Sequence, residues 1–358
     1  MRELTRQLEE LALSSEQAVY CRLVETRGST PQKPGATMLI YPDGSQAGTL
    51  GGGCVEAEVK RTALNYLKDD LARIAKFQLD HDYGWDDGLI CGGRMQILIQ
   101  PIKSDVSRTY IQQLCQLLRA APGFTEVIQY DLASEHELPT LLLFNERAQL
   151  QATLGPLENR SEEQAREQLI ALESRPRAYT RIGMAFLPSL ERCQLIIVGG
   201  GHVGQAVAKM AVDLEFDVTV VDDRESIISA ERFPNIQNRL AGDIEHVLPN
   251  LTITPHTYCL IVTRGHNHDQ RALYHLAERG ARYVGLIGSR RKIKLIFDDL
   301  LDAGIDRQSL EHVHAPLGIN IGSQTVPEIA VSICAELVSH RNRDGFVPGR
   351  PDGVNLSE

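Results

Sequence analysis

The strongest constraint in the chain is a glycine-rich turn that stands between an apolar strand and a helix. Residues 193–225 read CQLIIVGGGHVGQAVAKMAVDLEFDVTVVDDRE, the order of a strand, a glycine turn, a helix and a second strand. Gly199, Gly201 and Gly204 give the spacing GxGxxG, and Asp222 follows at the end of the second strand. Such glycines permit a tight turn, the helix N–H groups hold a phosphate, and the acid contacts a ribose hydroxyl. The segment therefore predicts the geometry of a dinucleotide-binding domain.

The alternation of strand and helix continues to the end of the second half. Further units lie at residues 257–280 and 281–304, and a last helix is expected at residues 325–341. Thr325 and Glu328 give that last helix a capping box, with Pro327 in its first turn. Repeated strand–helix units of this kind predict a parallel, doubly wound sheet.

Three further groups of residues lie where such a sheet places a ligand. The segment TRGHNHD is expected to form a loop at the carboxyl end of a strand, and the glycine turn brings His202 to the same crevice. A second segment, GLIGSRRK, opens a helix whose first turn carries cations, which favour a bound anion there; a solvated basic face explains them equally well. The candidate nucleotide-binding residues are Gly199, Gly201, His202, Gly204, Asp222, Arg264, His266, His268, Gly288, Ser289 and Arg290.

A metal site stays open as an alternative at the same loop. His266, His268 and Asp269 have side chains that suit a divalent ion, but the sequence offers no identifiable fourth ligand. A polar loop that contacts a ligand, or one that is only hydrogen-bonded within the protein, explains these residues as well.

The first hundred residues place helix and strand signals around a second glycine-rich stretch. Leu4, Leu8 and Leu11 lie at helical spacing, and YPDGS is a tight-turn signal between two strands. After GTLGGGC, apolar residues recur every four positions from Val55 to Leu67, which predicts one helix over VEAEVKRTALNYLKDDLARIA. The segment GLICGGRMQILIQPI ends in a predicted strand.

Residues 103–192 give weaker signals. SRTYIQQLCQLLRAAP predicts a helix and TLLLFNERAQLQATLG a hairpin. SEEQAREQLIALES predicts a charged helix that opens on Ser161 as its cap, with Gln164 three residues later. We interpret this region as the remainder of the first domain and a connector.

Composition and charge narrow the class of protein. Of the 358 residues, 42% are hydrophobic and 23% charged, and the apolar runs are too short to span a bilayer. The net charge of −10 without a basic tract argues against nucleic-acid binding. The N-terminus lacks the apolar core of a signal peptide, and seven scattered cysteines fit a reducing compartment, so we expect a cytoplasmic protein.

These signals together predict an α/β protein. We expect an N-terminal α+β domain with its connector at residues 1–190, and a Rossmann-like, doubly wound parallel-sheet domain at residues 191–340. The polar segment 341–358, rich in glycine and proline, is expected to be a disordered tail.

Two cysteines of the first half stand beside glycines, in GGGC and CGG. Cys54 is expected at a helix start, where N–H dipoles stabilise a thiolate, although Glu56 and Glu58 in the same turn oppose that effect. Cys91 precedes the second glycine pair. Two thiols beside exposed backbone suggest a ligand, but close packing of small residues explains the pattern equally well.

The combination of motifs resembles the XdhC/CoxI family of xanthine dehydrogenase accessory proteins. In the first half the similar segments are RGSTPQKPGATMLI, GTLGGGCVEAEV and GLICGGRM. In the second half they are VGGGHVGQAVAKMA, VVDDRE, VTRGHNHDQRAL, YVGLIGSRRK and PLGINIGSQTVPEIAVSI. These ordered motifs are spread over much of the chain, which makes the resemblance more specific than a single GxGxxG.

The resemblance implies a maturation factor rather than an enzyme. Such a protein binds the molybdenum cofactor (molybdopterin), holds it during sulfuration, and delivers it to a xanthine dehydrogenase-type molybdoenzyme. It implies a cysteine desulfurase as a second partner, and we expect a homodimer. The residues expected at the cofactor are Gly51, Gly52, Gly53, Cys54, Cys91, Gly92 and Gly93, with Cys54 and Cys91 as contacts to molybdenum or sulfur.

Two other functions remain open from the sequence. An NAD(P)-dependent oxidoreductase is favoured by the glycine turn and Asp222, but it lacks an evident set of proton-relay residues unless His266 and His268 supply one. A scaffold regulated by a nucleotide is the third possibility, with a partner bound by the first half.

Overall fold

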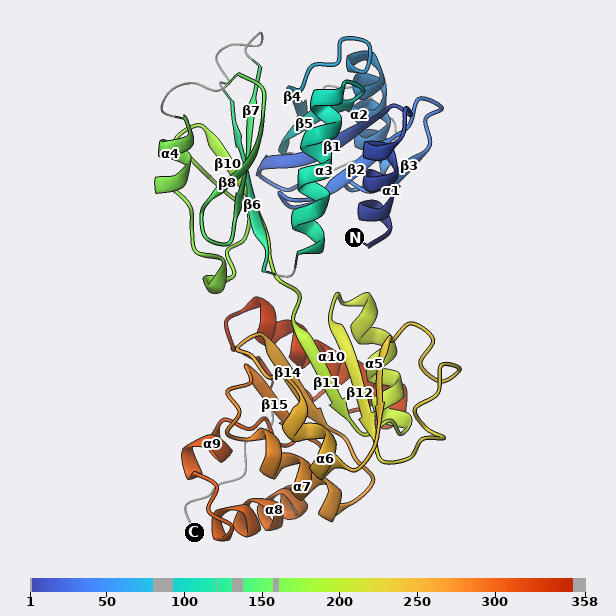
Figure 1. The fold of residues 1–358 in the computed structure, drawn as a ribbon, viewed down its shortest axis with the longest axis vertical. Helices are drawn as coiled ribbons and strands as arrows, with labels where there is room; N and C mark the ends of the chain where they lie inside the picture. Colours follow the sequence, from blue (N-terminus) through green and yellow to red (C-terminus); the bar gives the residue numbers. More distant parts are fainter. Residues whose placement is uncertain (1, 80–92, 121, 131–137, 157–160, 350–358) are drawn as a thin grey trace. The chain divides into compact units, whose positions relative to one another are not determined.

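The computed structural model describes residues 2–79, 93–120, 122–130, 138–156 and 161–349. The chain divides into two compact units, Met1–Glu191 and Arg192–Glu358 (Figure 1). No helix within the described ranges is long and apolar enough to cross a membrane.

The first unit begins with an antiparallel five-stranded sheet of order β3-β2-β1-β5-β4. Its strands are β1 (Ala18–Arg27), β2 (Thr37–Ile40), β3 (Gln46–Gly48), β4 (Arg73–Gln78) and β5 (Arg94–Ile102). Helix α2 (Gly53–Tyr66) packs its predicted apolar stripe on one face of this sheet, against residues such as Cys21 and Ile97. Helices α1 (Arg2–Leu13) and α3 (Asp105–Arg119) pack in the core on the opposite face, with Tyr20 and Leu98.

The helix predicted after the GGGC stretch is too long. It ends at Tyr66, and residues 73–75, which we expected to be helical, belong to the edge strand β4. The apolar repeat stops at Leu67, and Asp70 has a φ of 53°, a left-handed conformation that a helix of L-residues cannot continue through.

A second antiparallel sheet, of order β8-β7-β6-β10-β9, occupies the region where the sequence signals were weak. Its strands are β6 (Phe124–Gln129), β7 (Thr140–Asn145), β8 (Leu150–Leu154), β9 (Tyr179–Arg181) and β10 (Met184–Ser189). The predicted hairpin is confirmed as β7 and β8, whereas the other three strands were not predicted. The charged helix is shorter than predicted: α4 runs over Ser161–Glu167, with Ser161 as a helical residue, and a 3-10 turn follows at Leu172–Ser174.

The two sheets of the first unit share a core. Apolar residues of α1, α3, β1 and β5 pack in one cluster with residues of β6, β7 and β10. Inside it, the buried Arg22 of β1 lies 3.0 Å from the carboxylate of Glu126 on β6, which also accepts from the hydroxyl of Tyr110 on α3. The region that we interpreted as the remainder of the first domain and a connector therefore packs into the core of the first unit.

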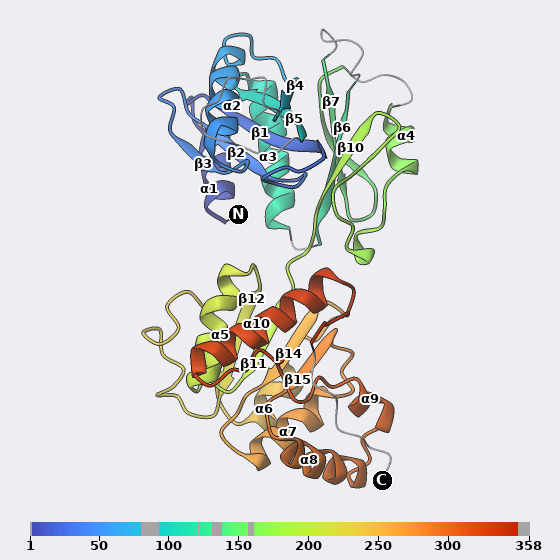
Figure 2. The same ribbon diagram turned by 180° about the vertical axis from the view of Figure 1, so that it is seen from behind.

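The second unit is a parallel, doubly wound sheet, as predicted (Figure 2). Its order is β13-β12-β11-β14-β15, with β11 (Gln194–Val198), β12 (Asp217–Asp222), β13 (Asn238–Ala241), β14 (Thr257–Ile261) and β15 (Tyr283–Leu286). One face is covered by α5 (His202–Asp213) and α10 (Val326–Asn342). The other is covered by α6 (Ile244–Val247), α7 (His266–Leu276), α8 (Arg290–Asp302) and α9 (Arg307–Glu311).

The predicted capping box of the last helix is confirmed. The side chain of Thr325 accepts from the N–H of Glu328, whose carboxylate accepts from the N–H of Thr325, and a proline lies in the first turn. The helix ends at Asn342, inside the segment expected as a tail, and residues 350–358 lie outside the described residues.

Candidate functional site

Three motifs of the first half meet at one end of the first sheet. Because β1 is antiparallel to β2 and β5, its C-terminal end lies beside the starts of both strands. Arg27 at the end of β1 pairs with Arg94 at the start of β5, and Gly48 at the end of β3 pairs with Met38 near the start of β2. Three segments therefore lie together at this end of the first sheet: the RGSTPQKPG turn, the GTLGGGC stretch and Gly93.

Close contacts join these motifs. A Cβ atom built on Gly51 would lie 2.5 Å from the ring of Pro31, and one built on Gly93 would lie 2.2 Å from the carbonyl oxygen of Ser29. Both glycines thus press against the turn that follows β1. At these two positions the absence of a side chain serves packing, one of the two explanations that the sequence left open.

The three glycines of the GGGC stretch also serve the backbone conformation. Gly51, Gly52 and Gly53 have φ angles of 121°, 75° and 63°, in the region that favours glycine. Around Cβ positions built on Gly52 and Gly53, no described atom lies within 4 Å. The backbone at the start of α2 is therefore uncovered by its described neighbours.

An acidic side chain of the same helix holds this glycine stretch. One carboxylate oxygen of Glu56 accepts from the N–H of Leu50 at 2.8 Å and from the N–H of Gly52 at 2.9 Å. The side chains of Gln46 and Thr49 donate to the same carboxylate. Partial burial raises the pKa of Glu56, but these hydrogen bonds outweigh it and lower the pKa to about 2.

Sequence reasoning treated Glu56 only as an opponent of a thiolate, and missed its role in the turn. The signal was available: an acidic residue four positions after Gly52 resembles a capping box, in which an acid in the first turn reaches back to the N-cap N–H.

Of the two cysteines beside glycines, Cys54 lies at the expected place. Its backbone belongs to the first turn of α2, whereas Cys91 and Gly92 lie outside the described residues. Five other cysteines are buried, as we expect for core residues: Cys21, Cys115, Cys193, Cys259 and Cys334. Burial raises the pKa of the Cys21 thiol to about 12, so that this thiol stays protonated.

In the second unit the glycine turn lines a cavity of about 360 Å³. Gly199 and Gly204 make close contact, because a Cβ atom on Gly204 would lie 1.9 Å from the carbonyl oxygen of Gly199. By contrast, a Cβ atom on Gly201 meets no described atom within 4 Å. The turn is therefore tight where the helix packs on the sheet and open toward the cavity, as a dinucleotide-type turn requires.

Asp222 is not free for the role that the sequence suggested. It is 5% exposed, and its carboxylate accepts from the N–H of Gly200 at 2.8 Å and from the N–H of Arg224 at 3.0 Å. The guanidinium of Arg224 also donates to both carboxylate oxygens. Burial raises the pKa of Asp222, but the hydrogen bonds from Arg224 and Gly200 bring it below its ordinary value.

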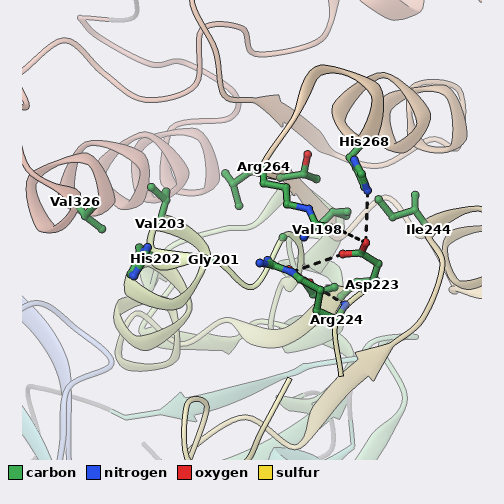
Figure 3. A pocket seen from close by; sticks show the side chains of 15 residues that line it. Val198, Gly201, His202, Val203, Asp223, Arg224, Ile244, Arg264, His268 and Val326 are labelled. Carbon is green, nitrogen blue, oxygen red and sulfur yellow. Dashed lines mark hydrogen bonds and ion pairs between the residues drawn. The ribbon is translucent and has the colours of Figure 1, made fainter. Parts of the chain in front are cut away.

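The neighbouring Asp223 lines the same cavity as Asp222, but its side chain is more exposed (Figure 3). Its Oδ2 is 2.8 Å from the guanidinium of Arg264 and 3.5 Å from Nε2 of His268. Asp223 and Arg224 were not among the predicted site residues, although they stand directly after Asp222 in VVDDRE. His202, Arg264 and His268 line the cavity, as expected.

Other predicted residues of this half are not brought together. His266 lies in the first turn of α7, not in a loop, and pairs with Asp299 at 3.6 Å. The buried carboxylate of Asp269 accepts from Thr263 and from Lys292. Gly288, Ser289 and Arg290 lie at the start of α8, where Ser289 is the N-cap, apart from the residues that line the cavity.

The metal alternative gains no support. His266, His268 and Asp269 each face a different partner. Within the ranges that the structure describes, no group of three or more His, Cys, Asp and Glu side chains could hold a metal ion.

The chain is similar to several known proteins over nearly its whole length. It is 27% identical over 353 residues to a probable xanthine dehydrogenase subunit of Bacillus subtilis (strain 168), covering 95% of this chain and 98% of that protein. It is 23% identical over 353 residues to the "Molybdenum cofactor insertion chaperone PaoD" of Escherichia coli (strain K12), covering 97% and 92%. A crystal structure of a xanthine dehydrogenase from Bacillus halodurans shares the fold, with a TM-score of 0.79, 23% identity and coverage of 95% and 96%.

Family models match in both halves. The model described as the XdhC and CoxI family matches residues 11–78, which include the first sheet through β4 and the whole of α2. The model described as the XdhC Rossmann domain matches residues 195–337, which run from β11 into α10. The two matches cover both glycine turns, and the chain belongs to the XdhC/CoxI family.

Proposed function

We propose that this protein binds the molybdenum cofactor and inserts it into a xanthine dehydrogenase-type molybdoenzyme. The proposal is supported by the family, by a relative named as a molybdenum cofactor insertion chaperone, and by one named as a probable subunit of a xanthine dehydrogenase. In this account the protein is a carrier and not an enzyme.

The observation that carries the proposal is the meeting of three motifs at one end of the first sheet. The turn after β1, the GGGC stretch and Gly93 lie far apart in the sequence and touch through Pro31, Gly51 and Ser29. Motifs that gather at one edge and leave helix-start backbone uncovered are suited to binding one ligand together.

The chemistry of this edge suits a phosphorylated, sulfur-rich cofactor. The N–H groups at the start of α2 would receive the phosphate, since a helix N-terminus carries partial positive charge. Glu56 already occupies the N–H groups of Leu50 and Gly52, so an anion would use the amides of Gly53 and Cys54 or displace the carboxylate. Thiolates of Cys54 and Cys91 would meet the molybdenum or its sulfur, with Gln32, Lys33 and Arg94 as further donors.

The finer steps follow from the same carrier role. We propose that the cofactor stays bound while a cysteine desulfurase supplies its terminal sulfur, and that a homodimer then delivers it to the target enzyme. An NAD(P)-dependent oxidoreductase would be the alternative if no cofactor is retained.

A retention assay tests the proposal. The purified protein is incubated with molybdenum cofactor and desalted, and the retained pterin is oxidised and measured by fluorescence. We expect retention by the wild type and a loss of at least about tenfold in Cys54→Ala and Cys91→Ala, since each removes a direct ligand. Cys193→Ala, which changes a buried thiol of the other unit, is the matched control and should retain the pterin. Absence of retention in the folded wild type would overturn the proposal.

A further inference from the structure

The cavity of the second unit combines an anion-binding end with an acidic wall. Gly201 is the N-cap of α5, and no described side chain caps this helix, whose first turn carries no acidic residue. The positive end of the helix therefore faces the cavity without a carboxylate of its own first turn, unlike the start of α2. A phosphate group is the ligand that such a helix start stabilises best.

The acidic wall is supplied by Asp223. Asp222, which occupies the usual position for a ribose contact, has both oxygens engaged by Gly200 and Arg224. Asp223 has a side chain 31% exposed, and its Oδ2 has a close partner in the guanidinium of Arg264 at 2.8 Å. Its Oδ1 lies 3.8 Å from the guanidinium of Arg224 and can accept a further hydrogen bond.

The charges around this wall are balanced. Arg224 pairs with Asp222, and Arg264 pairs with Asp223, so neither guanidinium is in excess. His268 adds positive charge only when it is protonated. A phosphate on the ribose would therefore meet a carboxylate without a surplus cation to offset it, whereas a ribose diol would find an acceptor.

We infer that this cavity binds a nucleoside diphosphate unit with an unphosphorylated ribose, and that Asp223, not Asp222, accepts from the ribose hydroxyls. The diphosphate lies on the N–H groups at Gly201 and His202, and the base lies against the apolar wall at Val221 and Ile244. The volume of about 360 Å³ is at the lower end of the range for ligand pockets and suits one nucleotide unit, with any second half of the ligand in solvent. The residues of this site belong to the second unit, whereas those proposed to bind the molybdenum cofactor belong to the first.

Calorimetric titration of the full-length protein tests the inference with four probes: ADP, NAD⁺, NADP⁺ and inorganic pyrophosphate. We expect ADP and NAD⁺ to bind, and NADP⁺ to bind at least about tenfold more weakly because its 2′-phosphate faces Asp223. Binding of ADP without NAD⁺ would identify a free nucleotide as the ligand, and binding of both would admit the dinucleotide. If pyrophosphate binds as tightly as ADP, or NADP⁺ as tightly as NAD⁺, the ribose assignment is wrong.

Three variants separate the parts of the site. Gly201→Ala places a methyl group in open space, so this variant should fold normally. The methyl group would crowd the diphosphate, so the variant should bind every nucleotide probe about tenfold more weakly or worse. Asp223→Asn should bind NAD⁺ more weakly than the wild type does, so that the affinities of the variant for NAD⁺ and NADP⁺ become similar. Asp298→Asn, an exposed acid of α8 outside the cavity, should bind like the wild type.

Two further outcomes would overturn the inference. One is a folded wild type, shown by its thermal unfolding transition, that binds none of the four probes. The other is an Asp223→Asn variant with unchanged affinities for both NAD⁺ and NADP⁺. Neither outcome bears on pterin retention, so failure here is distinguishable from failure of the carrier role.

Discussion

The two glycine turns of this protein start helices in different ways. At α2, the carboxylate of Glu56 accepts from two N–H groups of the glycine stretch. At α5, the carboxylate of Asp222, on the neighbouring strand β12, accepts from the N–H of Gly200 in the glycine turn. The helix start at Gly201 faces a cavity. A glycine-rich turn is therefore not in itself a binding site; what matters is which of its N–H groups the protein already uses.

The glycines of the two turns also differ in backbone conformation. In the first unit Gly51, Gly52 and Gly53 all have positive φ angles, and Gly51 packs closely on Pro31 as well. In the second unit Gly199 has a positive φ of 115°, Gly204 requires the absence of a side chain for close packing, and Gly201 has an ordinary φ of −65°. Substitutions at these positions should break the two turns in measurably different ways.

The largest effect is expected for Gly204→Ala. Its methyl group would lie 1.9 Å from the carbonyl oxygen of Gly199, so α5 must move away from β11. We expect a loss of about 3 kcal/mol in the free energy of unfolding of the second unit, measured by urea denaturation. Gly201→Ala is the control, with an expected change below about 1 kcal/mol; equal losses in the two variants would contradict the close contact.

Glu56→Ala should have the next largest effect. It leaves the N–H groups of Leu50 and Gly52 without their acceptor, and we expect a loss of about 1–2 kcal/mol because the group is only partly buried. Glu58→Ala removes an exposed ion pair with Arg61 and should cost less than about 0.5 kcal/mol. If the two variants are equally stable, Glu56 does not hold the turn.

Gly53→Ala is expected to cost about 1 kcal/mol. The φ of 63° is unfavourable for alanine, but the space around the position is open, so only backbone strain contributes. Gly53→Asn should recover part of the loss, because asparagine tolerates the left-handed region. A loss as large as that of Gly204→Ala would show a steric clash that the structure does not contain.

The smallest effect is the dependence of stability on pH through Glu56. Its folded pKa of about 2 lies below the ordinary value of 4.5, so its contribution is fully present above about pH 4.5 and is lost as the pH falls toward 2. The difference in stability between wild type and Glu56→Gln should shrink over this window by up to about 1 kcal/mol, since solvent screens a partly exposed group. A difference that grows as the pH falls would have the wrong sign.

The sequence predicted the second unit better than the first, for a physical reason. In the second unit β11, β12, β14 and β15 are rich in apolar residues, and a helix follows each of β11, β14 and β15, so local periodicity indicates these elements. Strand β13 was not predicted, because it carries the polar Asn238 and Arg239 and follows β12 without an intervening helix. In the first unit, β4 follows α2 after a short turn, and the apolar repeat alone did not distinguish the end of the helix from the start of the strand. Strand β10 pairs with β6, which is distant in sequence, and the three-residue strand β9 pairs with β10.

The candidate sites show the same limit. The spacing of Gly199, Gly201 and Gly204 was enough to locate the second turn, because the need for glycine at these positions arises within the turn and its flanking elements. The sequence could not tell that Asp222 would be engaged by Arg224, since that depends on where two side chains point after the strand ends. It therefore gave the ribose contact to Asp222. Both acids line the cavity, but the hydrogen bonds that engage Asp222 and the greater exposure of Asp223 favour Asp223.

The most direct test of the account measures both ligands on two single variants. Pterin retention and NAD⁺ titration are carried out on Cys54→Ala and on Gly201→Ala, each with its unfolding transition as a check of the fold. We predict that Cys54→Ala loses the pterin and binds NAD⁺ normally, while Gly201→Ala loses NAD⁺ and retains the pterin. If one variant loses both ligands while folded, or each loses the other's ligand, the assignment of one ligand to each glycine turn is wrong.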